Sequence, residues 1–325
     1  MPTMRPMPLN SGRIYAHSSD SDDYELAAKI GQGKYSEVFS GYNILNAKKV
    51  AVKLLKDVRL DKVRREAKIL GLLSEGGHRG HNTLVEVCRE RGTQKVLLVT
   101  EFIEGPQLAQ IHTTLQEKQI QKYLCEILLI TDRAHSLGIM HRDLKPSNTI
   151  VNRKTEELTI LDWGLGEFYL PNKDYHVRVA TKPYKAPELL LGITQYDYKI
   201  DVWAIGCILA GMLFRKEYMF PGKTDEMVLG LIVDLLGREP LDEYLDRLGV
   251  ELTAEFKQAV KHSKKTPWDK LLNPGDNYKK FEEAKDLLEK MLAIDPEKRC
   301  WAKEALNHRY FDEVRDEAKK TLHYK

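Results

Sequence analysis

The first residues with chemical potential form a glycine-rich segment at positions 31–38, Gly-Gln-Gly-Lys-Tyr-Ser-Glu-Val. It lies between two strand-like runs, where glycines let backbone amides approach a phosphate closely. A hairpin turn explains two glycines equally well, and Ser36 stands at the third glycine position of the usual pattern. Lys53 ends the strand-like run Val-Ala-Val-Lys, so its amine can point under that loop. Glu66 follows in a helical stretch and can pair with Lys53, although most such side chains are only solvated.

A second group of polar residues is far more specific. Residues 141–148 read His-Arg-Asp-Leu-Lys-Pro-Ser-Asn, residues 161–164 read Leu-Asp-Trp-Gly, and residues 186–188 read Ala-Pro-Glu. So many fixed identities in this order are not explained by chance, and they are the signature set of eukaryotic protein kinases. The chain therefore resembles that family from Tyr24 to Phe311.

The resemblance implies a role for each polar side chain. Phosphoryl transfer asks a protein mainly to position groups and to neutralise charge. Lys53 is expected to hold the α- and β-phosphates of ATP while Glu66 holds Lys53. Asp143 is expected to accept the substrate hydroxyl proton as catalytic base, and Lys145 to face the γ-phosphate.

The same resemblance implies a nucleotide and metal site. Two Mg²⁺ ions are expected on Asn148 and Asp162. The nucleotide is expected to contact the glycine-rich loop, apolar side chains around the base, and backbone groups of the connector. These residues are Ile30, Gly31, Gln32, Gly33, Lys34, Tyr35, Ser36, Glu37, Val38, Ala51, Lys53, Glu101, Ile103, Ile150 and Leu161. For the apolar members, plain core packing is an equally good explanation.

Hydrophobic periodicity predicts an α+β chain. Short β-branched runs alternate with one amphipathic helical stretch at 61–73, which indicates an antiparallel sheet with one main helix. The runs are 35–41, 50–55, 84–87 and 96–100. Beyond residue 105 the pattern becomes helical, with an apolar stripe in 116–137 and a segment at 198–214 that is apolar nearly all round.

The resulting domain prediction is a bilobal kinase fold. A flexible N-terminal tail, 1–22, precedes a small sheet lobe, 23–104, and a larger helical lobe, 105–313. Residues 314–325 are expected to form a C-terminal tail. The junction between the lobes, Glu-Gly-Pro at 104–106, has the composition of a turn.

Composition excludes several other classes of protein. The 325 residues are 42% hydrophobic and 30% charged, with a net charge of +3, so the chain is expected to bury a core and not to bind nucleic acid directly. The longest apolar run, 202–214, is shorter than the ~20 residues of a membrane span. Four distant cysteines indicate neither a disulfide framework nor a zinc site. A cytoplasmic or nuclear protein is expected.

Within the kinases, several segments resemble the catalytic alpha subunits of casein kinase II. They include Gly-Lys-Tyr-Ser-Glu-Val-Phe at 33–39, Asp-Trp-Gly at 162–164, Val-Arg-Val-Ala at 177–180 and Phe-Arg-Lys-Glu at 214–217. The resemblance implies a Ser/Thr kinase of acidic sites that uses both ATP and GTP and binds a dimeric beta-type regulatory subunit. Its expected substrate-binding cations are Arg178, Lys182, Lys185, Lys62, Arg64 and Arg65.

The chain also departs from that subfamily. Thr100 stands where the subfamily has Phe, and Ala51 where it has Val, so a larger cavity around the adenine is expected. The aromatic and acidic stretch that packs on the activation segment in casein kinase II is missing between Tyr15 and Asp22. Thr181 is the only Ser or Thr between Asp162 and Glu188, so no activating phosphosite is evident.

Other interpretations remain open at this point. A scaffold with the fold but no activity is disfavoured because all the signature residues are present. A proline-directed kinase is disfavoured by Lys182 and Lys185. A nucleic-acid binder would rest on the basic residues at 261–265, which are better explained as a solvated loop. His78 and His81 could suggest a metal, but neither an acid nor a cysteine stands near them.

Overall fold

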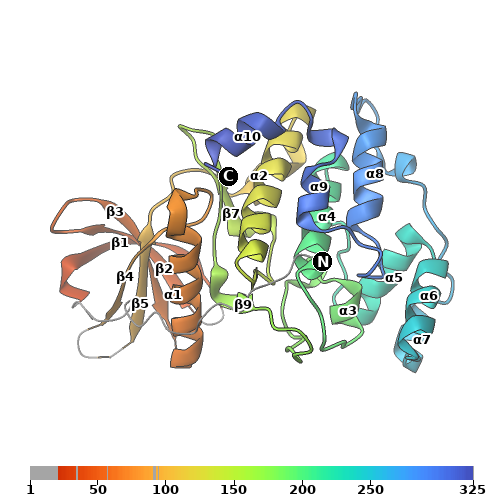
Figure 1. Cartoon of the computed structure of the whole chain (residues 1–325), viewed down its shortest axis with the longest axis horizontal. Helices are drawn as coiled ribbons and strands as arrows, with labels where there is room; N and C mark the ends of the chain where they lie inside the picture. Colours follow the sequence, from red (N-terminus) through yellow and green to blue (C-terminus); the bar gives the residue numbers. More distant parts are fainter. Residues whose placement is uncertain (1–20, 34–35, 57, 91–92, 94, 325) are drawn as a thin grey trace. The chain divides into compact units, whose positions relative to one another are not determined.

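The computed structural model describes residues 21–33, 36–56, 58–90, 93 and 95–324. The chain divides into two units, Met1–Glu75 with Asn82–Phe102, and Gly76–His81 with Ile103–Lys325 (Figure 1). Lys34 and Tyr35 of the glycine-rich loop, and nearly all of the expected N-terminal tail, lie outside the described residues.

The first unit contains a five-stranded antiparallel sheet in the order β1-β2-β3-β5-β4. Its strands are β1 (Tyr24–Gln32), β2 (Ser36–Asn43), β3 (Lys49–Leu55), β4 (Leu84–Arg89) and β5 (Val96–Glu101), with α1 (Leu60–Ser74) between β3 and β4. The sequence predicted four of the strands and the helix within a few residues. It did not list β1 as a strand.

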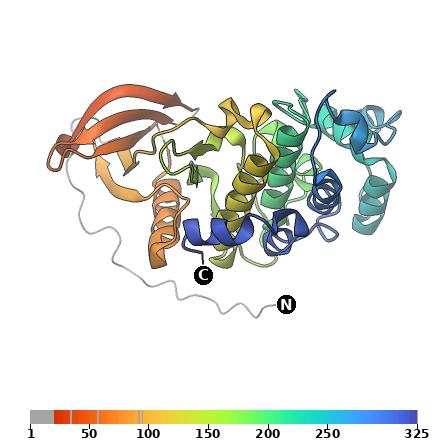
Figure 2. The same ribbon diagram turned by 90° about the horizontal axis from the view of Figure 1, so that it is seen from above.

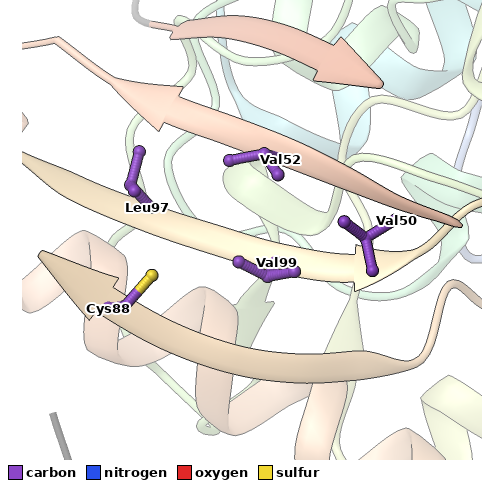
Figure 3. Close-up of a cluster of buried hydrophobic side chains, with 5 residues drawn as sticks. All are labelled: Val50, Val52, Cys88, Leu97 and Val99. Carbon is purple, nitrogen blue, oxygen red and sulfur yellow. The ribbon is translucent and has the colours of Figure 1, made fainter. Parts of the chain in front are cut away.

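Strand alternation divides the apolar residues of this sheet between its two faces. Val50, Val52, Cys88, Leu97 and Val99 form one buried cluster (Figure 3). On the other face, Leu55 and Leu98 pack against two residues of α1, Val63 and Ala67. Lys53 has the same parity in β3 as Leu55, so it lies on the face that α1 covers.

The second unit is mostly helical. Its long elements are α2 (Glu117–Ser136) and α4 (Lys199–Leu213). Two short antiparallel pairs join β6 (Ile139–Met140) to β9 (Glu167–Phe168) and β7 (Thr149–Val151) to β8 (Leu158–Ile160). The other helices are α3 (Pro187–Leu190), α5 (Asp225–Leu236), α6 (Glu239–Leu248), α7 (Ala254–Ala259), α8 (Phe281–Met291), α9 (Ala302–Leu306) and α10 (Arg315–Thr321).

The burial of the helices follows the sequence pattern. The predicted stripe of α2 is buried along its length: Ile120, Leu124, Ile127, Leu128 and Thr131. Every residue of α4 is buried, as expected from its apolar composition. The segment expected as a C-terminal tail instead forms α10, which packs against α2 because Ala318 and Leu322 are apolar and buried (Figure 1 and Figure 2).

The α+β fold class predicted from the sequence is confirmed, with the five-stranded antiparallel sheet and α1 in one unit and the other helices in the second. All four cysteines are free thiols. Among the described residues, no helix has both the length and the apolarity needed to cross a membrane.

Candidate active site

In the first unit, Lys53 and Glu66 form the ion pair that their spacing suggested. Lys53 Nζ lies 2.7 Å from Glu66 Oε1, and both side chains are largely buried. The pair forms because Lys53 faces α1, whose buried side contains Val63, Glu66 and Ala67. Separating the pair would leave a buried charge without a partner, which is costly. Glu66 therefore holds the lysine amine in one place.

In the second unit, the segment after β6 carries the catalytic-loop motif. Asp201 of α4 accepts hydrogen bonds from the backbone N–H groups of His141 and Arg142, both at 2.8 Å, and lies 3.0 Å from His135 Nε2. Burial alone would raise the pKa of the Asp201 carboxyl, but the His135 contact and the backbone donors hold its pKa below the usual range. A buried anion thus fixes the start of the loop.

The ring of His141 orders the next residues. His141 Nε2 lies 3.1 Å from the Leu161 carbonyl, and Nδ1 lies 3.2 Å from the Asp143 backbone nitrogen. These partners require a proton on Nε2 and a lone pair on Nδ1, which is the neutral ring. His141 therefore links the backbone beside Asp162 to the backbone of Asp143.

The Asp143 carboxylate is surrounded by donors on both oxygens. Lys145 Nζ donates to Oδ2 at 2.8 Å, and Asn148 Nδ2 lies 3.3 Å from the same oxygen. Thr181 donates to Oδ1 from its backbone N–H at 2.9 Å and from its hydroxyl at 2.8 Å. Lys145 Nζ also donates to Thr181 Oγ1 at 2.7 Å. A carboxylate held in this way is fixed in orientation, as a proton acceptor requires.

Asn148 lies close to this carboxylate, and a backbone hydrogen bond places Asp162 near Asn148. The Leu161 N–H donates to the Asn148 carbonyl at 2.7 Å, which places Asp162 next to Asn148. Asn148 uses Nδ2 for its bonds to Asp143, so its amide oxygen is left as an acceptor. A carboxylate and an amide oxygen fit Mg²⁺, which binds proteins through one or two such ligands and completes its shell with phosphates and water.

Three residues at this site adopt left-handed backbone angles without being glycine. Their φ values are 68° for Arg142, 56° for Asp162 and 62° for Ala180. One precedes Asp143, one is the candidate metal ligand, and one precedes Thr181. Such angles are disfavoured for residues with a Cβ and tend to cluster where geometry matters for function.

The Arg142 guanidinium is occupied by groups of the chain itself. It donates to the Leu165 carbonyl at 2.7 Å and to the Tyr196 hydroxyl at 3.0 Å, and it lies 3.8 Å from Glu167. The Tyr196 hydroxyl in turn donates to the His176 carbonyl at 2.8 Å. In kinases that are activated by phosphorylation, this arginine binds the phosphate. Here internal acceptors connect it to the activation segment.

The Ala-Pro-Glu motif is held by an ion pair that the sequence did not predict. Arg299 donates to both oxygens of Glu188, at 2.7 and 3.0 Å, and both side chains are fully buried. The guanidinium also donates to the Lys199 carbonyl at 2.8 Å. Arg299 thus joins the segment after Thr181 to the start of α4.

The residues expected around the nucleotide are divided between the units. In the first unit, Gly33 N–H donates to the Ser36 carbonyl at 2.8 Å, while Val38 and Ala51 are half-buried. In the second unit, Ile150 lies in β7 and Leu161 directly follows β8, and both are half-buried. These positions agree with exposure to a ligand but do not by themselves assign one.

The cations expected to bind substrate differ in exposure. In α1, Lys62 and Arg64 are exposed and Arg65 is half-buried. In the activation segment, Arg178 and Lys182 are both exposed.

Lys185 does not match its prediction. It is expected to bind an acidic substrate, but it is only 7% exposed and its Nζ lies 3.1 Å from Asp225 Oδ2. The Asp225 carboxylate, 40 residues further along the chain, contacts the Lys185 amine in place of water.

Sequence reasoning also missed some positioning residues. Asp201 and Arg299 were not named, and Thr181 was noted only as part of the docking loop. A signal for Asp201 was present, because a carboxylate in the apolar segment 198–214 must find buried partners. No local signal connects Arg299 to Glu188, since 111 residues separate them.

The comparison with known families agrees with this geometry. The family model of the protein kinase domain matches residues 24–311. The chain therefore belongs to the protein kinase family, and the predicted phosphotransferase class is confirmed. Members of this family transfer phosphate from ATP to proteins and use a divalent metal ion.

Proposed function

We propose that the protein is a Ser/Thr kinase that phosphorylates acidic sites, similar to the casein kinase II alpha subunit, with ATP and also GTP as phosphate donors. The observation that carries the proposal is the Asp143 carboxylate in contact with Lys145 and Thr181. The resemblance in the segments 33–39, 162–164 and 214–217 supports the finer assignment.

The contact between Thr181 and Asp143 supports Ser/Thr over Tyr acceptors. Thr181 lies in the segment that docks the substrate, residues 177–185, and its backbone nitrogen is 2.9 Å from Oδ1 of the candidate base, Asp143. A Ser or Thr of a substrate chain that runs along this segment can then reach Asp143 with its short side chain. A tyrosine hydroxyl would require the substrate backbone to stand further out.

The proposed roles follow from the charges and contacts. Asp143 accepts the hydroxyl proton, Lys145 neutralises the transferred phosphate, and Lys53, held by Glu66, binds the other phosphates. Asn148 and Asp162 hold Mg²⁺, which supplies charge neutralisation when it is bound. The residues of the glycine-rich loop and its apolar neighbours bind the nucleotide.

A kinase assay on defined peptides tests the proposal. We expect wild-type protein with Mg²⁺ and radiolabelled ATP to phosphorylate a serine peptide with acidic residues faster than a proline-directed or a tyrosine peptide, and GTP to compete. Lys53→Met, Asp143→Asn and Asp162→Asn should each lower the rate by about 10²-fold or more. Lys48→Met is the matched control, because Lys48 is an exposed lysine that directly precedes β3. A wild-type rate no higher than that of Asp162→Asn would support the scaffold interpretation.

We also propose a binding surface for a beta-type regulatory dimer on the sheet of the first unit, through Leu26, Phe39 and Leu54. Leu26 is 46% exposed and Phe39 is half-buried, which favours a contact surface. Leu54 packs against the buried cluster of Figure 3, which favours ordinary core. Phe39→Glu should abolish co-purification with such a dimer while the kinase remains folded. We also propose a cytoplasmic or nuclear location, which the four dispersed cysteines favour.

A further inference from the structure

Lys185 and Asp225 form a pair that changes the charge of the docking segment. Lys185 follows a short 3-10 turn, Lys182–Tyr184, and its amine contacts Asp225 Oδ2 at 3.1 Å. The Lys185 side chain is 9% exposed and that of Asp225 is 33% exposed. Asp225 is the first residue of α5, where the helix dipole favours a negative charge. The carboxylate is thus stabilised from two sides.

The pair lies close to the catalytic carboxylate. Thr181 contacts Asp143 directly, and Lys185 lies only four positions after it in the chain. At about 2 Å of rise per residue in a 3-10 turn, the pair lies within roughly 10 Å of Thr181 along the segment. When the acceptor serine of a substrate lies at Asp143, the substrate residues before and after it therefore lie next to Lys185 and Asp225.

A substrate carboxylate at this place meets two opposite charges. It is attracted by Lys185 and repelled by Asp225, so most of the electrostatic gain is lost. To take Lys185 for itself it must displace Asp225, whose Oδ1 is already buried without a hydrogen-bond partner among the described residues. Leaving that carboxylate without its cation is unfavourable.

The other cations of the segment differ. Lys182 Nζ donates to the Lys223 carbonyl, a neutral acceptor, so it keeps its net charge. Arg178 forms no ion pair or side-chain hydrogen bond with another described residue, and it is exposed. These two side chains remain able to attract an acid, whereas Lys185 does not.

We propose that Asp225 is a specificity-determining residue, which neutralises Lys185 and so makes the kinase indifferent to an acidic side chain next to the phosphorylated residue. This inference rests on the proposed kinase function. Arg178, Lys182 and the cations of α1 then select acidic substrates. They attract acidic residues that are further from the phosphorylated residue in the substrate sequence. Removal of the Asp225 charge should create selectivity that the wild-type protein lacks.

Paired peptides test the inference. Each pair carries Asp or the isosteric Asn directly after the acceptor serine, and a second pair carries them directly before it. We expect a kcat/KM ratio within about threefold for wild-type protein. Asp225→Asn should raise the ratio in one of the pairs to about tenfold, mainly through KM. Lys185→Met combined with Asp225→Asn should return it to the wild-type value.

Asp234→Asn is the matched control, since it removes an exposed carboxylate from the same helix and should leave the ratios unchanged. A wild-type ratio above tenfold would overturn the inference without any variant, and so would an unmoved ratio in folded Asp225→Asn. Absence of transfer from wild-type protein to every peptide would instead overturn the proposed kinase function, and the inference with it. The two failures are therefore distinguishable.

Discussion

Thr181 donates two hydrogen bonds to one oxygen of Asp143, from its backbone N–H and from its hydroxyl. The same hydroxyl accepts from Lys145, so the two charged groups are joined by one side chain as well as directly. A residue of the activation segment thereby fixes both the candidate base and the cation beside it.

Thr181→Val should lower kcat by about 10- to 100-fold while KM for ATP stays within about twofold. The valine keeps the shape of threonine but loses the hydroxyl, and small displacements of catalytic groups have large effects on rate. Steady-state kinetics measure the effect. Thr181→Ser is the control and should retain most of the activity. Full kcat in Thr181→Val would show that the hydroxyl does not position Asp143.

Glu188→Ala should destabilise the second unit by about 3–5 kcal/mol, because it leaves a fully buried guanidinium without its counter-charge. Urea unfolding followed by circular dichroism measures the change. Asp242→Ala removes the partner of Arg238 in an exposed pair and should change the free energy of unfolding by no more than about 1 kcal/mol. Equal effects of the two substitutions would contradict the assignment.

Glu126 should make stability depend on pH. It is fully buried in α2, and burial raises the pKa of its carboxyl to about 7, only partly opposed by the bond from the Leu158 N–H at 2.8 Å. Its other oxygen has no partner among the described residues. Because the folded pKa lies above the unfolded value, the folded state binds the extra proton. Stability is therefore lost as pH rises from about 4.5 to 7.

Glu126→Gln removes this titration. The stability of the variant relative to wild type should rise by up to about 3 kcal/mol between pH 5 and pH 8, since one pKa unit corresponds to about 1.4 kcal/mol. Urea midpoints at several pH values measure it. Glu289→Gln, an exposed glutamate in α8, should show no such trend. A constant difference between Glu126→Gln and wild type across this range would exclude a raised pKa.

The residue at position 100 should control which inhibitors bind. Thr100 is buried and pairs with Ala51 across β3 and β5, so two small side chains stand where bulkier ones are found in casein kinase II. An ATP-competitive inhibitor with a large aromatic group should bind wild type at least tenfold more tightly than Thr100→Phe. Calorimetric titration measures both affinities. Equal affinities would show that Thr100 does not limit the pocket.

The sequence predicted those elements whose pattern is local. Helix α4 is buried all round and α2 has a clear stripe, so composition and periodicity were sufficient to find them. Strand β1 was not identified because it is an edge strand with most residues exposed, and its Ala, Lys and Gly residues show neither alternation nor β-branching. Pairing with β2 alone makes it a strand.

The site was predictable to the extent that its residues belong to short motifs. The Lys53–Glu66 pair could be expected, because the two residues are only 13 positions apart. The helix that contains Glu66 follows the strand that contains Lys53 and covers it. The neutralisation of Lys185 could not, because its partner Asp225 lies in another helix and nothing near Lys185 indicates it. Charges can be counted along a sequence, but their pairing depends on the tertiary fold.

The buried Asp201 carboxylate has a consequence for how the second unit opens. Its bonds hold the amide hydrogens of His141 and Arg142 against the first turn of α4. These two amides can exchange with deuterated solvent only when the loop separates from a helix that is buried along its whole length. The catalytic loop should thus share the slow exchange of α4, and belong to the last part of the molecule to unfold locally.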